Sequence, residues 1–91
     1  MKVVIVGAGR VGFQVAKQLT EENQDVVLFE WEPETARYAS GNLDCMVIND
    51  DGTSLRVLRK ANIDNADFFI SLTDSDEKNM IACGLVSSSF T

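Results

Sequence analysis

The sequence predicts an α/β domain with a parallel β-sheet, and two observations lead to this prediction. Four short apolar runs are spaced along the 91 residues and have the composition of strands buried on both faces. Segments whose apolar residues recur at helical spacing separate them. Strands that alternate with helices through short loops imply right-handed crossovers, so we expect a single domain over residues 1–91 with strand order 3-2-1-4.

The first two strand–helix units lie in the N-terminal half of the chain. A β-branched run at 3–6 predicts the first strand, and apolar residues near helical spacing over 10–22 predict the helix that follows. A second apolar run at 26–29 predicts the next strand. A proline suits the first turn of a second helix, which we expect over residues 33–40, with Gly41 capping its C-terminal end.

The rest of the chain continues this alternation. Runs at 45–48 and 68–72 predict the third and fourth strands, and the hydroxyl and carboxylate side chains after each run are typical of helix N-termini. The third helix is expected to begin after a cap at Thr53 or Ser54, and the last helix to cover residues 75–88. Three side chains of the third helix should turn inward: Leu55, Leu58 and Ala61.

Charge and composition exclude several classes of function. The net charge is −6, and the eight Lys and Arg residues are scattered rather than gathered into a stripe, so binding of nucleic acid is not expected. Histidine is absent, which removes the commonest general base and the usual metal ligand. We therefore expect a binding domain that has neither catalytic residues nor a metal site.

Hydropathy and cysteine usage predict the compartment. No apolar run approaches the roughly 20 residues that a membrane-spanning helix requires, and the stretch at 3–6 is too short for a signal peptide. We expect a cytoplasmic chain without direct membrane insertion. Cys45 and Cys83 lie within apolar runs and lack the spacing of a metal site, which predicts buried free thiols.

A glycine motif between the first strand and the first helix predicts a nucleotide-binding loop. The six residues form a complete G-x-G-x-x-G: Gly7, Ala8, Gly9, Arg10, Val11 and Gly12. Gly7 permits the tight turn, Gly9 lets the backbone approach a pyrophosphate, and Gly12 lets the helix pack closely on the strand. The amides at the start of the helix would then face the phosphates.

An acidic residue at the end of the second predicted strand supports the same ligand. Glu30 stands eighteen residues after Gly12, close to the ~20 residues expected for an acid that binds a ribose diol. The alternative is that the glycines form only a tight turn and that Glu30 is a solvated strand end. With Glu32 nearby, Glu30 should repel a 2′-phosphate, so NAD(H) is favoured over NADP(H), while ATP and ADP stay open.

Other residues near the expected carboxyl edge of the sheet have two interpretations each. Arg10 either contacts a phosphate or is an exposed charge. Asp51 follows the third strand and either accepts from an adenine amino group or caps the next helix. Thr73 and Asp74 follow the fourth strand and either contact the pyrophosphate or cap the last helix. Trp31 is expected to cover a sheet edge or an interface rather than an adenine face.

Several segments together are similar to a known family. The glycine loop with its strand, the end of the second strand, the turn after the third and the residues around the fourth resemble the TrkA N-terminal domain, the RCK or KTN module of potassium channels and transporters. These segments are Val4–Gly12, Leu28–Glu30, Asn49–Thr53, Ala66–Asp67 and Thr73–Asn79. The resemblance covers essentially the whole chain and implies a Rossmann-like regulatory domain in the cytoplasm that binds NAD(H), ATP or ADP.

The resemblance also implies partners and residue roles. It implies a ring of paired domains that passes the ligand state to a membrane potassium channel or transporter subunit. By position, the three glycines match the phosphate loop, Glu30 the ribose acid, Asp51 the adenine-side acid and Thr73 the threonine after the fourth strand. Asp50 stands where the family usually has glycine, which leaves the detailed shape of the adenine pocket open.

The length of the chain departs from the family, whose members continue into two more strands and often into a second ligand-binding domain. We therefore expect the Rossmann-like sheet to be truncated before strands 5 and 6. The apolar fourth strand at 68–72 would then be an edge, so a homodimer or a higher homo-oligomer is expected.

Two other functions fit the same residues. One is the cofactor-binding fragment of an NAD-dependent dehydrogenase, because the fold alone does not decide the function. An enzyme would need substrate-binding and catalytic residues beyond the last helix, so the regulatory binding domain is the leading prediction. The other is a fragment that has lost both its partner and its ligand.

Overall fold

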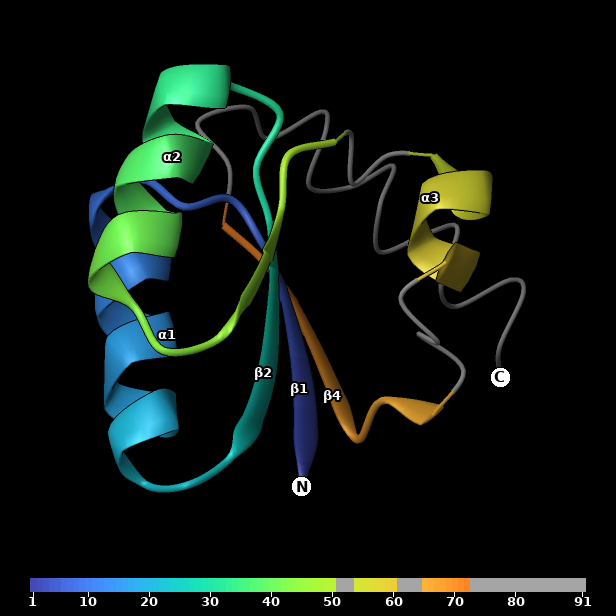
Figure 1. Cartoon of the computed structure of the whole chain (residues 1–91). Coiled ribbons are helices and arrows are strands. Elements are labelled where there is room, and N and C mark those ends of the chain that lie inside the picture. The colour runs from blue at the N-terminus through green and yellow to red at the C-terminus, as the bar shows by residue number, and fades with distance from the viewer. Residues whose placement is uncertain (51–53, 61–64, 73–91) are drawn as a thin grey trace.

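The computed structural model describes residues 1–50, 54–60 and 65–72, and in this part strands alternate with helices (Figure 1). In chain order the elements are β1 Lys2–Val6, α1 Arg10–Glu21, β2 Asp25–Phe29, α2 Pro33–Asn42, β3 Met46–Ile48, α3 Leu55–Lys60 and β4 Phe68–Ser71. The strands are parallel, in the order β3-β2-β1-β4. The predicted fold class and strand order are thus confirmed. The helix expected over residues 75–88 lies outside the described residues.

The strand register brings the carboxyl ends of the strands to one edge of the sheet. At the end of β1, Val6 pairs with Phe29 of β2 on one side and with Ser71 of β4 on the other. Phe29 pairs in turn with Ile48, the last residue of β3. The chain segments that follow β1, β2 and β3 therefore leave the sheet at the same edge, next to the point between β1 and β4 where the strand order reverses.

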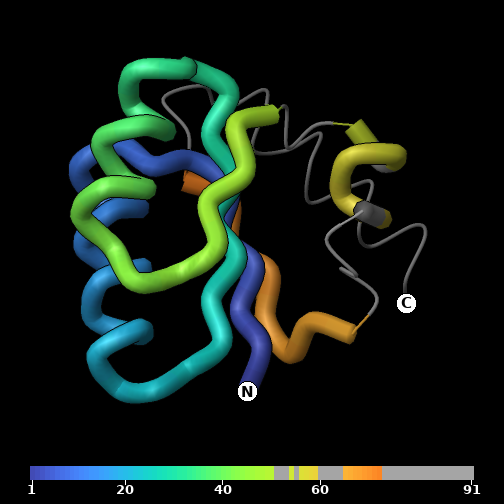
Figure 2. Tube along the Cα trace, viewed as in Figure 1, coloured from blue at the N-terminus to red at the C-terminus, as the bar shows by residue number. Residues whose placement is uncertain are grey.

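Helices cover both faces of the sheet. In Figure 1 and Figure 2, α1 and α2 lie over one face and α3 over the other. Each face has its own apolar cluster, with Ile5 and Leu28 fully buried on the α1–α2 side and Val4 and Phe29 fully buried on the α3 side. Successive strand residues point to opposite faces, which explains why the strands are continuous apolar runs rather than alternating ones.

The end of α2 differs from the prediction. The helix was expected to stop near residue 40 with Gly41 as its cap, but it continues through Asn42, and Leu43 is the C-cap. The physical reason is the burial of Leu43, whose side chain is 8% exposed and belongs to the cluster under α1 and α2. The Leu43 N–H donates to the carbonyl of Ala39 at 2.9 Å, so the last helical hydrogen bond is made by a residue whose side chain is buried.

Helix α3 packs on the second face of the sheet, with one predicted and one unpredicted inward side chain. Leu58 is fully buried, which confirms its predicted inward orientation, and Val57 is also buried. The Leu58 N–H donates to the carbonyl of Ser54 at 3.0 Å, so Ser54 stands at the start of the helix. The predictions for Thr53, Ala61 and the Leu55 side chain lie outside the described part of the chain.

Cys45 is a free thiol on the α1–α2 side of the sheet. It is half-buried, where a buried thiol was predicted, and Cys83 is outside the described ranges. Burial raises the pKa of the Cys45 thiol above its ordinary value of 9.0; the nearby Asp44 carboxylate also raises it, and a hydrogen bond with Thr20 acts in the opposite sense. Across the described residues, none of the helices has the length and apolar character needed to cross a membrane.

Candidate functional site

The glycine loop after β1 forms a tight turn that is bonded to the end of β2. Gly7 has a φ of 106°, in the region that favours glycine, so the turn requires this residue type. Its N–H donates to the carbonyl of Phe29 at 2.8 Å. The next amide, that of Ala8, donates to the Oε1 atom of Glu30 at 2.7 Å in a buried contact. The two parts of the predicted site are therefore joined directly.

The other two glycines of the loop have different reasons to lack a side chain. A Cβ atom on Gly12 would lie 1.8 Å from the carbonyl oxygen of Gly7, so Gly12 is needed for the close approach of α1 to the loop. A Cβ atom on Gly9 would have no neighbour within 4 Å, and the φ of Gly9 is −70°, which any residue adopts. Neither packing nor conformation within the described residues requires glycine at position 9. As far as the described residues are concerned, the space beside it is open to a ligand.

The N-terminus of α1 lies at this loop, and no side chain of the helix's own first turn caps it. Gly9 is the N-cap and contributes no side-chain hydrogen bond, and the first turn contains no acidic residue. The Phe13 N–H donates to the carbonyl of Gly9 at 2.8 Å, so the helical hydrogen bonding begins there. A helix start of this kind favours a bound anion, since its first amides and the helix dipole both attract negative charge.

Arg10 and Val11, the two variable residues of the motif, are both exposed on the first turn of α1. Val11 is 59% exposed. Arg10 is the first residue of α1, and its exposed position fits both of its interpretations, so its role stays a prediction. The loop therefore adds a cation close to the open space at Gly9.

Glu30 is the one buried charged side chain among the described residues, with 8% exposure. Its Oε1 atom accepts from Ala8 and its Oε2 atom accepts from the Glu32 N–H at 3.0 Å. A carboxylate has about four lone-pair sites, so both oxygens can still accept from a ligand hydroxyl. The description of Glu30 as a solvated strand end is wrong, because the carboxylate is buried against the glycine loop.

Sequence reasoning missed Asn49, which follows β3 at the same edge. Its Nδ2 atom donates to the carbonyl of Glu30 at 2.8 Å and to that of Trp31 at 3.1 Å. The signal in the sequence was its place in the segment after the third predicted strand, which was used only for the family resemblance. The residue thus connects the ends of β2 and β3 next to the Glu30 carboxylate.

Of the remaining candidate site residues, the structure describes Trp31 and Glu32. Asp51, Thr73 and Asp74 lie outside the described residues. Trp31 is 58% exposed after β2. Glu32 is the N-cap of α2, and its Oε1 atom accepts from the Glu34 N–H at 2.9 Å, so its carboxylate has a structural task near Glu30.

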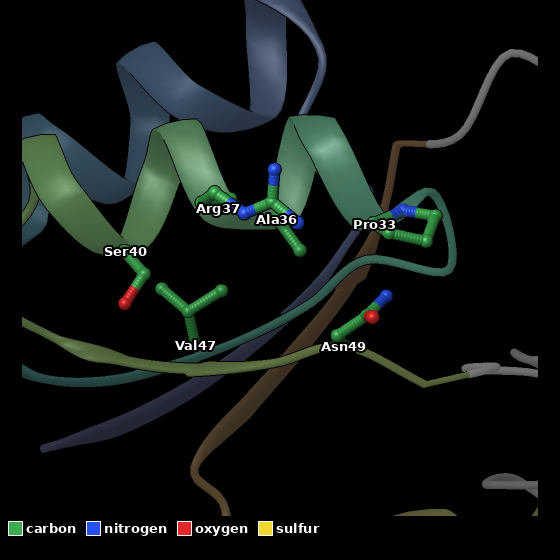
Figure 3. A pocket seen from close by; sticks show the side chains of 6 residues that line it. All are labelled: Pro33, Ala36, Arg37, Ser40, Val47 and Asn49. Atoms are coloured by element: carbon green, nitrogen blue, oxygen red, sulfur yellow. The ribbon is translucent and has the colours of Figure 1, made fainter.

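A pocket of about 250 Å³ lies apart from the glycine loop, between α2 and β3 (Figure 3). Pro33, Ala36, Arg37 and Ser40 line it from α2 and its start, and Val47 and Asn49 line it from the other side. None of the predicted site residues is among these six. Asn49 also contacts the segment that carries Glu30, through the carbonyls of Glu30 and Trp31.

Taken together, the loop can hold an anion and a neighbouring hydroxyl-bearing group. The open backbone at Gly9 and the first amides of α1 suit a phosphate, and the Glu30 carboxylate lies one hydrogen bond away from the same loop. A carboxylate accepts from the hydroxyls of a sugar but repels a second phosphate. A phosphate joined to a ribose has this combination of groups.

Comparison with known proteins gives one family and a group of named relatives. The sequence model of the TrkA-N domain matches residues 3–90. The chain is 44% identical over 86 residues to a "Trk system potassium uptake protein TrkA homolog" of Methanothermobacter thermautotrophicus, covering 94% of this chain and 40% of the relative. A homolog of the same name from Pyrococcus abyssi is 45% identical over 83 residues, covering 91% and 37%.

A bacterial relative and a solved structure extend the comparison. The Trk system potassium uptake protein TrkA of Azorhizobium caulinodans is 42% identical over 83 residues, covering 91% of this chain and 18% of that protein. The solved structure is the Kef CTD of Shewanella denitrificans in an AMP-bound form, with a TM-score of 0.83 and 20% identity over 99% of this chain and 52% of that one. The chain therefore spans less than half of the length of the Trk relatives, and the Kef likeness is one of fold.

Proposed function

The chain belongs to the TrkA-N domain family, and on that premise we propose that it binds an adenine nucleotide at the glycine loop and acts as a regulatory domain of a potassium transport system. In this proposal the pyrophosphate or phosphate lies against Gly9 and the N-terminus of α1. Glu30 accepts from the hydroxyls of the adenosine ribose, and Arg10 adds a charged donor to the phosphates.

The observation that carries the proposal is the unused space at Gly9. Gly7 and Gly12 are explained by the fold itself, through a positive φ and a 1.8 Å approach. Gly9 is not, because a Cβ there would meet no atom within 4 Å. A ligand that lies close to the backbone here would explain why position 9 is a glycine. The adjacent start of α1 and the buried Glu30 carboxylate supply polar partners for that ligand.

The ligand is NAD(H) or a nucleotide that shares its adenosine half, namely ATP, ADP or AMP. The family membership and the AMP-bound form of the Kef structure support an adenine nucleotide. Glu30 and Glu32 both carry negative charge beside the expected ribose, which disfavours the 2′-phosphate of NADP(H). Asp51 and Thr73 are proposed to contact the adenine side and the phosphate side, respectively.

The regulatory role is proposed from the names of the relatives. Their shared description as potassium uptake proteins supports a membrane transporter or channel subunit as partner and a cytoplasmic location beside it. We propose no catalysis, since the 91 residues contain no histidine. Regulation requires that the nucleotide bind two conformations of the assembly with different affinities. Binding then shifts the equilibrium toward the conformation with the higher affinity.

Isothermal titration of the purified chain tests the proposal. The titrants are NADH, NAD, NADPH, ATP, ADP and AMP, each against the unaltered chain and against Glu30→Ala. Saturable binding of at least one nucleotide without a 2′-phosphate is expected, weakened roughly tenfold in the variant, with NADPH bound more weakly than NADH. If none of the six binds to the unaltered chain, the proposed function fails.

A further inference from the structure

Asn49 extends the connection between β2 and β3 beyond the point where strand pairing stops. The last residue pair of the two strands is Phe29 with Ile48, and the Glu30 N–H still donates to the carbonyl of Ile48 at 2.9 Å. One residue after Ile48, the Asn49 side chain forms the next hydrogen bonds between the two segments. Its Nδ2 atom donates to two successive carbonyls, those of Glu30 and Trp31.

The backbone of Glu30 is consequently held on both sides of its α-carbon. Its N–H is bonded to β3 and its carbonyl to the Asn49 amide, at 2.9 and 2.8 Å. With both peptide units fixed, the direction of the Cα–Cβ bond is fixed as well. From this direction the side chain reaches the glycine loop, where Oε1 accepts from Ala8 at 2.7 Å.

We propose that Asn49 is a positioning residue for the nucleotide site: its side-chain amide sets the backbone of Glu30 so that the carboxylate faces both the glycine loop and the ribose. The inference rests on the proposed function, because it assigns Glu30 to the ribose. Asn49 itself touches no ligand in this account. It acts only through Glu30, which distinguishes it from a direct binding residue.

A matched control residue is present in α2. The Nδ2 atom of Asn42 donates to the carbonyl of Tyr38 at 2.7 Å, so Asn42 also bonds a backbone carbonyl from an exposed position. It does so within its own helix and away from Glu30. Asn42→Ala therefore removes the same kind of hydrogen bond without touching the site.

The test measures how strongly each variant recognises the ribose 2′-hydroxyl. ADP and 2′-deoxy-ADP are titrated into the unaltered chain, Asn49→Ala, Asn42→Ala, Glu30→Ala and the Glu30→Ala/Asn49→Ala double variant. Asn49→Ala is expected to lower the preference for ADP over 2′-deoxy-ADP roughly fivefold, and to have no further effect in the Glu30→Ala background. Asn42→Ala is expected to leave this preference unchanged. Equal weakening of both ligands, additivity with Glu30→Ala, or no effect of Asn49→Ala would overturn the proposal.

A second measurement needs no ligand and separates this inference from the proposed function. The Ala8 amide proton reports its bond to Glu30 through its NMR chemical shift. We expect Asn49→Ala to shift this resonance and Asn42→Ala to leave it in place. If nucleotides fail to bind but the Ala8 resonance moves as expected, only the nucleotide assignment is lost. An unmoved resonance in a folded Asn49 variant contradicts the positioning role.

Discussion

At the residue scale, three glycines of one loop meet three different physical requirements. Gly7 adopts a φ of 106°, Gly12 leaves room for the carbonyl of Gly7, and Gly9 leaves open space. Substitutions at these positions should therefore fail in different ways. A change at Gly12 should affect folding, whereas a change at Gly9 should affect binding.

Gly12→Ala should destabilise the fold, and Gly41→Ala should not. Both glycines lie within helices, but an added Cβ meets the Gly7 carbonyl oxygen at 1.8 Å in one case and nothing within 4 Å in the other. We expect a loss of about 1–3 kcal/mol in unfolding free energy for Gly12→Ala. For Gly41→Ala we expect a gain of about 0.5–1 kcal/mol from helix propensity. Urea denaturation measures both, and equal midpoints for the two variants would refute the steric account.

Cys45 should react slowly with iodoacetamide in the folded chain, when measured in a Cys83→Ala background. Burial, the largest influence, raises the thiol pKa above 9.0, so the reactive thiolate is depleted at lower pH. The pKa of the Cys45 thiol is higher in the folded chain than in the unfolded chain. The folding stability that this difference contributes is therefore fully present below the unfolded pKa and is lost as the pH rises through the folded pKa. Alkylation should be faster in urea than in buffer at each pH. An equal or faster rate in the folded chain would contradict this.

Residue types predicted the structural roles of Gly7 and Gly12, because each role depends on local backbone geometry. The ribose-binding role of Glu30, inferred from its spacing after the motif, stays a prediction. The side-chain contacts of Asn49 could not be predicted in the same way. They join residues 18 and 19 positions apart across two strand ends, and only the folded register brings those groups together. The added task of Glu30, accepting from Ala8, was missed for the same reason.

At the scale of elements, the strands and α1 were predicted closely, and the end of α2 was not. Continuous apolar runs located the four strands, and the register confirms their pairing. The expected burial on both faces holds for β1 and β2 but was wrong for the outer strands, where Met46 of β3 is 60% exposed and Phe68 of β4 is 54% exposed. A glycine near a helix end normally indicates the cap, but at Gly41 tertiary burial prevailed. The buried Leu43 extended the helix to Asn42, an effect that local propensity does not include.

Leu43→Ala should therefore destabilise the chain more than its place at a helix end suggests. The side chain is 8% exposed and packs in the cluster beneath α1 and α2, so its removal should cost about 2–4 kcal/mol of unfolding free energy. Leu43→Met keeps the apolar volume and should cost less than about 1.5 kcal/mol. Both are measured by urea denaturation, and a small cost for the alanine variant would show that Leu43 does not anchor the helix.

At the scale of the whole molecule, parallel strand order gathers the site at one edge. The loop after β1, Glu30 after β2 and Asn49 after β3 come from separate parts of the sequence and meet because parallel strands share a carboxyl edge. This gathering followed from the predicted strand order alone. The roles of Asp51 and Thr73 stay predictions, since both lie outside the described residues.

The most direct test of the nucleotide site is titration of ADP into the unaltered chain and into Gly9→Ala, with urea denaturation of both. A Cβ at Gly9 meets no atom of the described residues, and the backbone conformation accepts alanine. The loss from alanine at an N-cap and the gain from a less flexible unfolded chain are each about 1 kcal/mol or less and oppose one another, so the two chains should differ little in stability. Affinity for ADP should nevertheless fall roughly tenfold or more, because the methyl group occupies the space assigned to the phosphate. Equal affinity in two equally stable chains would contradict the account.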